Sequence, residues 1–172
     1  MEFEPVLEPR PAWKEFVVFM LQVVAATSCL GLAVDVVTAN VAVEYFTVHH
    51  PHVVDSDSPW VMALIWGIGA SWWFGLIAAA LIWFANSRRA MPLTRKRIFR
   101  MIIKALIVTW VLMMLILVGV YFLGGLVPES SRRASFEHDR RLMAVAMAHL
   151  YEYAIGGIAC LVLMFRVWRL RD

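Results

Sequence analysis

Four long apolar blocks divide this chain along its whole length. Each block exceeds the ~20 residues that an α-helix needs to cross a ~30 Å hydrocarbon layer. Apolar residues make up 62% of the 172 residues and charged residues only 17%, whereas soluble domains average nearer half apolar and a quarter charged. The excess apolar side chains are therefore expected to face lipid. The blocks cover residues 16–43, 60–85, 101–127 and 142–165.

These blocks predict an all-α fold, an integral membrane four-helix bundle. The bundle is expected to form a single transmembrane domain over residues 1–172. Its helices are expected at about residues 14–44, 59–86, 97–126 and 139–168.

Basic residues indicate how the bundle is oriented. Seven lysines and arginines, with no acid among them, lie between residues 88 and 104, and three more arginines close the chain. Because cytoplasmic loops carry an excess of Lys and Arg, both termini and this basic connection are expected in the cytoplasm. The protein is expected to be a multi-pass protein of the bacterial inner membrane. The net charge of +3 follows from this bias and gives no support for nucleic-acid binding.

Small residues recur every four positions along the second predicted helix, at Gly67, Ser71, Gly75 and Ala79. Such a ridge lets another backbone approach closely, which is a common way for membrane helices to associate. The partner is either another helix of the same chain or a second copy. A homo-oligomer and a larger membrane complex therefore both stay open, alongside contact with membrane lipid.

Ionisable side chains interrupt the first and last apolar blocks. Asp35 lies within the first block and Glu44 at its end, while His149 and Glu152 lie in the last block. Ionisable groups at membrane depth are costly, and they usually face a bundle interior or a water-filled cavity and mark a functional path. The sequence therefore predicts an outward-facing polar site between the first and fourth helices.

Helical spacing refines this prediction. His149 and Glu152 are three residues apart and project together from a helix, and Tyr153 follows His149 by four residues on the same face. Because pairing relieves the cost of an ionised group in hydrocarbon, we expect Glu44 and His149 to approach one another. The neighbours of this pair are expected to be Asp35, Glu152 and Tyr153.

Three interpretations of this polar cluster stay open. The cluster is a metal centre if it holds a divalent zinc, iron or manganese ion, because imidazole and carboxylate groups suit these metals. It is a proton or quinone site if His149 titrates near neutral pH with Glu152 or Asp35 as its partner. It is structural if its groups hydrogen-bond one another to fix helix packing. The metal ligands would be His149, Glu44, Glu152 and His50.

The element Glu44-Tyr45-Phe46-Thr47, followed by His50-Pro51, carries a resemblance to a known group of proteins. The chain resembles an uncharacterised family of small bacterial four-helix integral membrane proteins with this element after the first helix and an Ala-His-x-x-x-Tyr motif in the last. Val43 and Glu152 depart from the family, in which proline and serine are common at these positions. The resemblance implies no activity, but it groups the polar site as Asp35, Glu44, Tyr45, His149, Glu152 and Tyr153.

The expected function is binding of a metal or a proton-coupled small ligand at this site, and catalysis there stays open. The alternative is a non-catalytic accessory or assembly subunit of a larger membrane complex. The sequence contains no nucleotide-binding loop, nucleophile–base motif or dinucleotide fingerprint, so no particular reaction is predicted.

Overall fold

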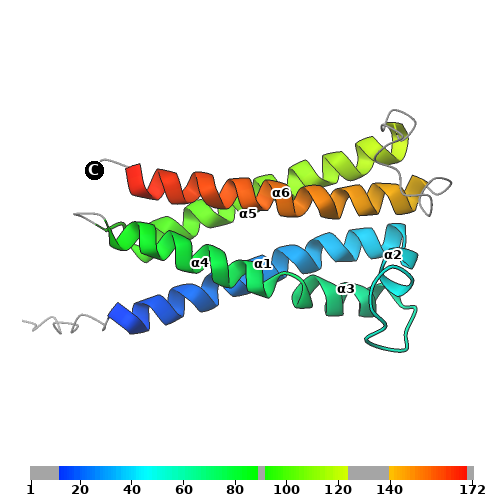
Figure 1. The fold of residues 1–172 in the computed structure, drawn as a ribbon, viewed down its shortest axis with the longest axis horizontal. Helices are drawn as coiled ribbons and strands as arrows, with labels where there is room; N and C mark the ends of the chain where they lie inside the picture. The colour runs from blue at the N-terminus through cyan, green and yellow to red at the C-terminus, as the bar shows by residue number, and fades with distance from the viewer. Residues whose placement is uncertain (1–11, 89–91, 124–139, 170–172) are drawn as a thin grey trace, which may run out of the picture.

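The computed structural model describes residues 12–88, 92–123 and 140–169 (Figure 1). Every regular element within these residues is a helix, and the helices form an antiparallel bundle. The start of α1, the end of α4, the start of α5 and the end of α6 lie at one end of the bundle, and α2 lies at the other (Figure 1). The elements are α1 (Ala12–Val41), α2 (Glu44–Thr47), α3 (Pro59–Gly69), α4 (Trp72–Ser87), α5 (Arg95–Leu123) and α6 (Arg140–Arg169).

Four helical segments are long and apolar enough to cross a membrane, which confirms this part of the prediction. They are α1, the pair α3–α4, α5 and α6, each of 29 or 30 residues. At 1.5 Å per residue, 29 residues extend about 44 Å, more than the ~30 Å of a hydrocarbon core. Large apolar side chains are exposed on the outside of the bundle, for example Leu21 at 65%, Phe122 at 72% and Ile158 at 63%. A surface of this kind is suited to lipid rather than water.

The first two of these segments are less regular than the apolar pattern predicts. The first helix ends at Val41, and the chain begins a separate short helix, α2, at Glu44. The second segment breaks between Gly69 and Trp72, where α3 ends and α4 begins. Gly and Ser pairs are common sites of helix kinks, and the hydroxyl of Ser71 donates to the carbonyl oxygen of Gly67. The break therefore lies next to Gly69, a residue of low helix propensity, and at Ser71, whose side chain bonds the backbone.

Glycines bring helices α3 and α4 close to α1. A Cβ added to Gly67 would lie 2.7 Å from the Cα of Leu32, and one added to Gly75 would lie 2.9 Å from the Cα of Val24. Gly31 on α1 meets the same surface, because a Cβ there would contact Ser71 and the carbonyl of Gly67. The small-residue ridge predicted on the second helix therefore packs against α1 of the same chain.

Polar contacts fix the end of the bundle opposite α2. Arg95 at the start of α5 donates to the carboxylate of Glu15 at 2.9 Å and to the side-chain oxygen of Gln22 at 2.7 Å, both on α1. The side chain of Asn86 exchanges two hydrogen bonds with the backbone of Leu93, of 3.1 and 2.8 Å, across the α4–α5 connection. Three helices are thus held in a fixed arrangement at this end.

Candidate functional site

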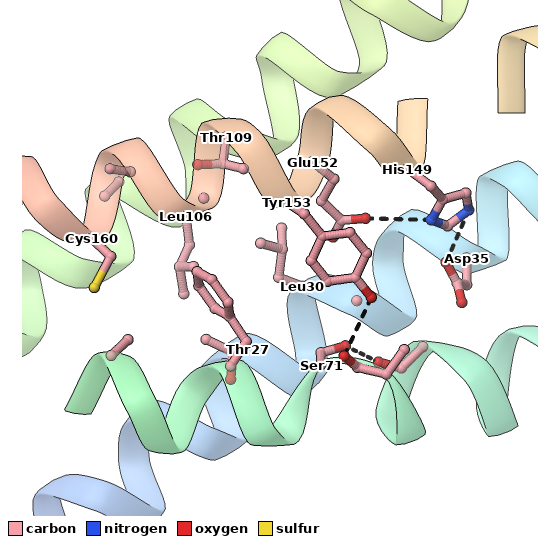
Figure 2. Close-up of a pocket in the computed structure, with 18 of the residues that line it drawn as sticks. Thr27, Leu30, Asp35, Ser71, Leu106, Thr109, His149, Glu152, Tyr153 and Cys160 are labelled. Carbon is pink, nitrogen blue, oxygen red and sulfur yellow. Dashed lines mark hydrogen bonds and ion pairs between the residues drawn. The ribbon is translucent and has the colours of Figure 1, made fainter. Parts of the chain in front are cut away.

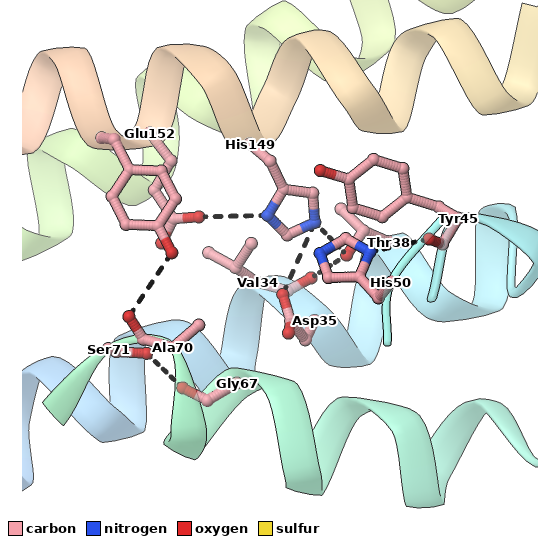
Figure 3. Close-up of polar contacts among 11 residues, drawn as sticks. Val34, Asp35, Thr38, Tyr45, His50, Gly67, Ala70, Ser71, His149 and Glu152 are labelled. Atoms are coloured by element: carbon pink, nitrogen blue, oxygen red, sulfur yellow. Dashed lines mark hydrogen bonds and ion pairs between the residues drawn. The ribbon is translucent and has the colours of Figure 1, made fainter. Parts of the chain in front are cut away.

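A row of three ionisable side chains joins α1 to α6 inside the bundle. The imidazole of His149 lies between two carboxylates, with Nε2 3.6 Å from Oδ1 of Asp35 and Nδ1 3.6 Å from Oε2 of Glu152 (Figure 3). The side chains of Asp35, His149 and Glu152 are only 6%, 12% and 16% exposed. Screening by solvent is weak for buried pairs, so the electrostatic interactions of the imidazole with the two carboxyl groups are strong.

Thr38 links the imidazole of His149 to the backbone of α1. The hydroxyl of Thr38 donates its proton to the carbonyl oxygen of Val34 at 3.2 Å. The same oxygen lies 3.2 Å from Nε2 of His149, and it accepts from Nε2 in the tautomer that carries the ring proton there. In this tautomer the unprotonated Nδ1 is the nitrogen that lies 3.6 Å from the carboxyl group of Glu152.

The short helix α2 covers the imidazole with aromatic rings. Tyr45 stacks on His149 with ring centroids 4.9 Å apart and planes within 5°, and Phe46 meets the same ring edge-on at 5.6 Å. The imidazole of His149 is therefore enclosed by aromatic rings on the side of α2. Burial raises the pKa of the Tyr45 phenol to about 12, and the Asp35 carboxylate adds to this rise. The phenol is therefore neutral near pH 7.

His50 holds α2 and the following chain against α3. Its Nδ1 lies 2.9 Å from the carbonyl oxygen of Tyr45, and its ring meets that of Trp66 with centroids 4.7 Å apart. Burial lowers the pKa of His50 below its ordinary value. The neutral imidazole must carry its proton on Nδ1, because a carbonyl can only accept. His50 therefore serves here as a hydrogen-bond donor to the backbone.

The row lies at one end of a cavity within the bundle (Figure 2). The cavity encloses about 110 Å³, which is room for several water molecules or a small organic group. Its end near α2 is lined by Asp35, His50, His149, Glu152 and Tyr153. Its remaining length, toward the α4–α5 end, is mainly apolar and is lined by residues such as Leu30, Phe74, Ile82, Leu106, Cys160 and Leu163.

The expected site residues have different places in this arrangement. Asp35, Tyr45, His50, His149, Glu152 and Tyr153 all line the cavity. The hydroxyl of Tyr153 points across it and donates to the carbonyl oxygen of Ala70, at the α3–α4 break, over 3.4 Å. Glu44 does not line the cavity. Its carboxylate is half exposed and lies 3.8 Å from the guanidinium of Arg141 at the start of α6. Among the described residues, the carboxylates within ion-pair distance of His149 are those of Asp35 and Glu152.

The four residues expected as metal ligands are not gathered around one point. Within residues 12–88, 92–123 and 140–169, no group of three His, Cys, Asp or Glu side chains is placed to hold a metal ion. Asp35 and Glu152 lie on opposite nitrogens of His149, so one ion cannot contact all three groups. A metal at this site stays a prediction that would require the side chains to rearrange.

The sequence did not single out several of the residues that line the cavity. Thr27 on α1 and Thr109 on α5 are buried polar side chains at the cavity wall. Both were visible as hydroxyl groups inside apolar blocks, which is a weak signal, because the Thr27 hydroxyl simply bonds the carbonyls of Val23 and Val24. Trp66 and Phe74 gave no signal, since aromatic residues are ordinary in apolar helices.

Comparisons with known proteins give no further guide to the site: no protein family, curated protein or solved structure matches this chain. The resemblance carried by residues 44–47 and by Ala148, His149 and Tyr153 stays a prediction from the sequence.

Proposed function

We propose that the chain is a multi-pass protein of a bacterial inner membrane, with both termini and the α4–α5 connection in the cytoplasm. The cations at residue 88 and at residues 95–104 support this orientation, because the end of α4 and the start of α5 lie at the end of the bundle opposite α2. The row of Asp35, His149 and Glu152 then lies toward the outer side of the membrane.

We further propose that the cavity binds a small amphiphilic ligand of the quinone type and that binding is coupled to proton transfer. The observation that carries this proposal is the position of the ionisable row at one end of a mainly apolar cavity. Ligand sites are typically apolar pockets in which a few convergent polar groups fix the ligand's orientation. An apolar ring and tail suit the length lined by Leu30, Phe74 and Leu106, and carbonyl oxygens suit the donors at the other end.

The donors are the hydroxyl of Tyr153, once it leaves the carbonyl oxygen of Ala70, and the imidazole of His149, once it leaves Thr38. A ligand carbonyl that accepts from the imidazole changes the contacts of a ring that lies 3.6 Å from each of two carboxylates. Uptake or release of a proton is therefore expected to accompany binding. This interpretation is favoured over a metal centre because the two carboxylates flank the imidazole rather than converge with it.

Isothermal titration calorimetry with a short-chain benzoquinone tests the proposal. Purified protein in detergent is titrated at pH 7 in two buffers that differ in ionisation enthalpy, so that the difference in heat gives the number of protons exchanged. We expect saturable binding with a non-zero proton count. The variants Asp35→Asn and His149→Gln should lose binding or its proton coupling, whereas Asp57→Asn, an exposed acid in the connection before α3, should keep both.

Two results would overturn the proposal. In the first, the parent protein fails to bind the quinone, and the row variants only lower thermal stability, as expected for a structural role. In the second, elemental analysis finds a stoichiometric metal in the parent that is lost in His149→Ala, as expected for a metal centre.

A further inference from the structure

A second hollow lies on the outside of the bundle, in the groove between α5 and α6. Its volume is about 610 Å³, and it is more open than the central cavity. Cationic side chains gather at the end of the groove nearest the α4–α5 connection, namely Arg97 and Lys104 from α5 and Arg166 from α6. The rest of the groove is lined chiefly by apolar side chains, among them Val108, Leu112, Ile155, Ile158 and Val162.

The charge of the groove is one-sided. Its three cations are exposed, and the described residues that line it include no acid. The neighbouring Arg95, in contrast, is paired with Glu15 on α1. The basic end is therefore suited to an anionic group that comes from outside the chain.

The length of the groove matches one leaflet of a bilayer. From Arg166 at its basic end to Ile155 at its apolar end, α6 rises by eleven residues, or about 16 Å. Half of a ~30 Å hydrocarbon core is about 15 Å. Both helices pass the middle of their length near the apolar end, since α5 covers Arg95–Leu123 and α6 covers Arg140–Arg169. The groove thus extends from the membrane surface to the bilayer midplane.

We infer that this groove is a binding site for one anionic phospholipid of the cytoplasmic leaflet. The headgroup phosphate contacts the three cations, and an acyl chain lies along the apolar side chains between α5 and α6. Basic pockets between transmembrane helices on the cytoplasmic side are suited to anionic headgroups. The inference rests on the proposed orientation in the membrane but not on the identity of the ligand in the central cavity.

The bound acyl chain also covers a thin part of the bundle wall. Four residues line both the groove and the central cavity: Ala105, Thr109, Ala159 and Leu163. Two of them are alanines, whose side chains are single methyl groups. A lipid in the groove therefore lies against the part of the bundle wall that these four residues share with the central cavity.

Native mass spectrometry of the purified full chain tests this site. The protein in detergent micelles is titrated separately with dioleoylphosphatidylglycerol, which is anionic, and with dioleoylphosphatidylcholine, which is zwitterionic. We expect the parent to retain one phosphatidylglycerol with roughly tenfold or greater preference, since each nearby cation favours an anionic lipid several-fold. The combined variant Arg97→Gln, Lys104→Gln, Arg166→Gln should lose this preference.

A matched control separates a built site from general surface charge. The combined variant Arg88→Gln, Lys96→Gln, Arg100→Gln removes the same charge from three exposed cations that do not line the groove, and it should keep the preference. Val108→Trp, which fills the apolar part and leaves the cations in place, should weaken retention of both lipids. Equal retention of the two lipids by the parent, or an equal loss in the control variant, would overturn the inference. Circular dichroism and size-exclusion chromatography confirm that each variant is folded.

Discussion

The close approach of α3 to the backbone of α1 gives a prediction with opposite signs at two glycines. Gly67→Ala adds a Cβ that would lie 2.7 and 2.8 Å from the Cα and nitrogen of Leu32, and 2.9 Å from the carbonyl carbon of Gly31. All three atoms belong to the backbone of α1, so they cannot move aside as the end of a side chain can. Ordinary contact begins at 3.4 Å, and α1 and α3 must therefore separate by about 0.7 Å.

Two effects decide the size of the change. Replacing Gly by Ala within a helix stabilises it by about 1 kcal/mol. Overpacking a well-filled contact costs about 1–3 kcal/mol, and a contact with rigid backbone belongs at the upper end. We expect Gly67→Ala to lower the free energy of unfolding by about 2 kcal/mol. A Cβ at Gly119, four residues before the last residue of α5, meets nothing within 4 Å, so Gly119→Ala should keep the propensity gain of about 1 kcal/mol.

Unfolding by increasing amounts of sodium dodecyl sulfate in mixed micelles, followed by circular dichroism, measures both changes. The two variants differ by the same single methyl group, and the expected difference between them is about 3 kcal/mol. If Gly67→Ala is as stable as Gly119→Ala, the close approach of α1 and α3 does not stabilise the bundle, and the reasoning fails.

Three further predictions concern two contacts outside the row and the orientation of the chain in the membrane. Asn86→Ala removes both hydrogen bonds across the α4–α5 connection and should lower the free energy of unfolding by about 1–3 kcal/mol in the same assay; an unchanged value would contradict this. Because burial lowers the pKa of His50, its neutral form stabilises the fold above the unfolded pKa of about 6.5, and this stability is lost as pH falls below it. The thermal midpoint should therefore fall less between pH 7.5 and 5.5 in His50→Gln than in the parent, and an equal fall would refute the role given to this contact with Tyr45. In intact cells of a cysteine-free variant, an impermeant thiol reagent should label cysteine at position 55 and not at position 96, and the reverse pattern would invert the proposed topology.

The four long apolar helical segments could be predicted from sequence, because a helix suited to crossing a membrane requires a long apolar segment and hydropathy reports such segments directly. The break at Ala70 and Ser71 could not, because the apolar pattern continues through it. A break of this kind depends on small residues and on local hydrogen bonds, such as that from Ser71 to Gly67, which hydropathy does not measure.

The sequence predicted which ionisable residues form the polar cluster, but it did not predict which carboxylates pair with His149. The cost of ionised groups in hydrocarbon singled out Asp35, His149 and Glu152, and the three lie together in the structure. That Asp35 rather than Glu44 faces His149 follows from the rotation of α1 about its axis and from the new direction that the chain takes at α2. Both depend on how helices pack against one another, and the spacing of residues along one helix carries no information about them. The cavity was not predicted for the same reason, since its wall combines side chains from several helices.

Asp35 and His149 are synthesised far apart in time. Asp35 precedes His149 by 114 residues in the chain, and ribosomes add ~5–20 residues per second, so His149 follows about 6–23 s later. In a chain that inserts as it is synthesised, α1 enters the membrane before His149 exists. A charged group at the centre of a helix costs about 2.5–3.5 kcal/mol, and Asp35, six residues before the end of α1, carries a part of this cost. Insertion of α6 brings His149 to Asp35. The last helix therefore completes the site and, at the same step, relieves the cost of the carboxylate on the first helix.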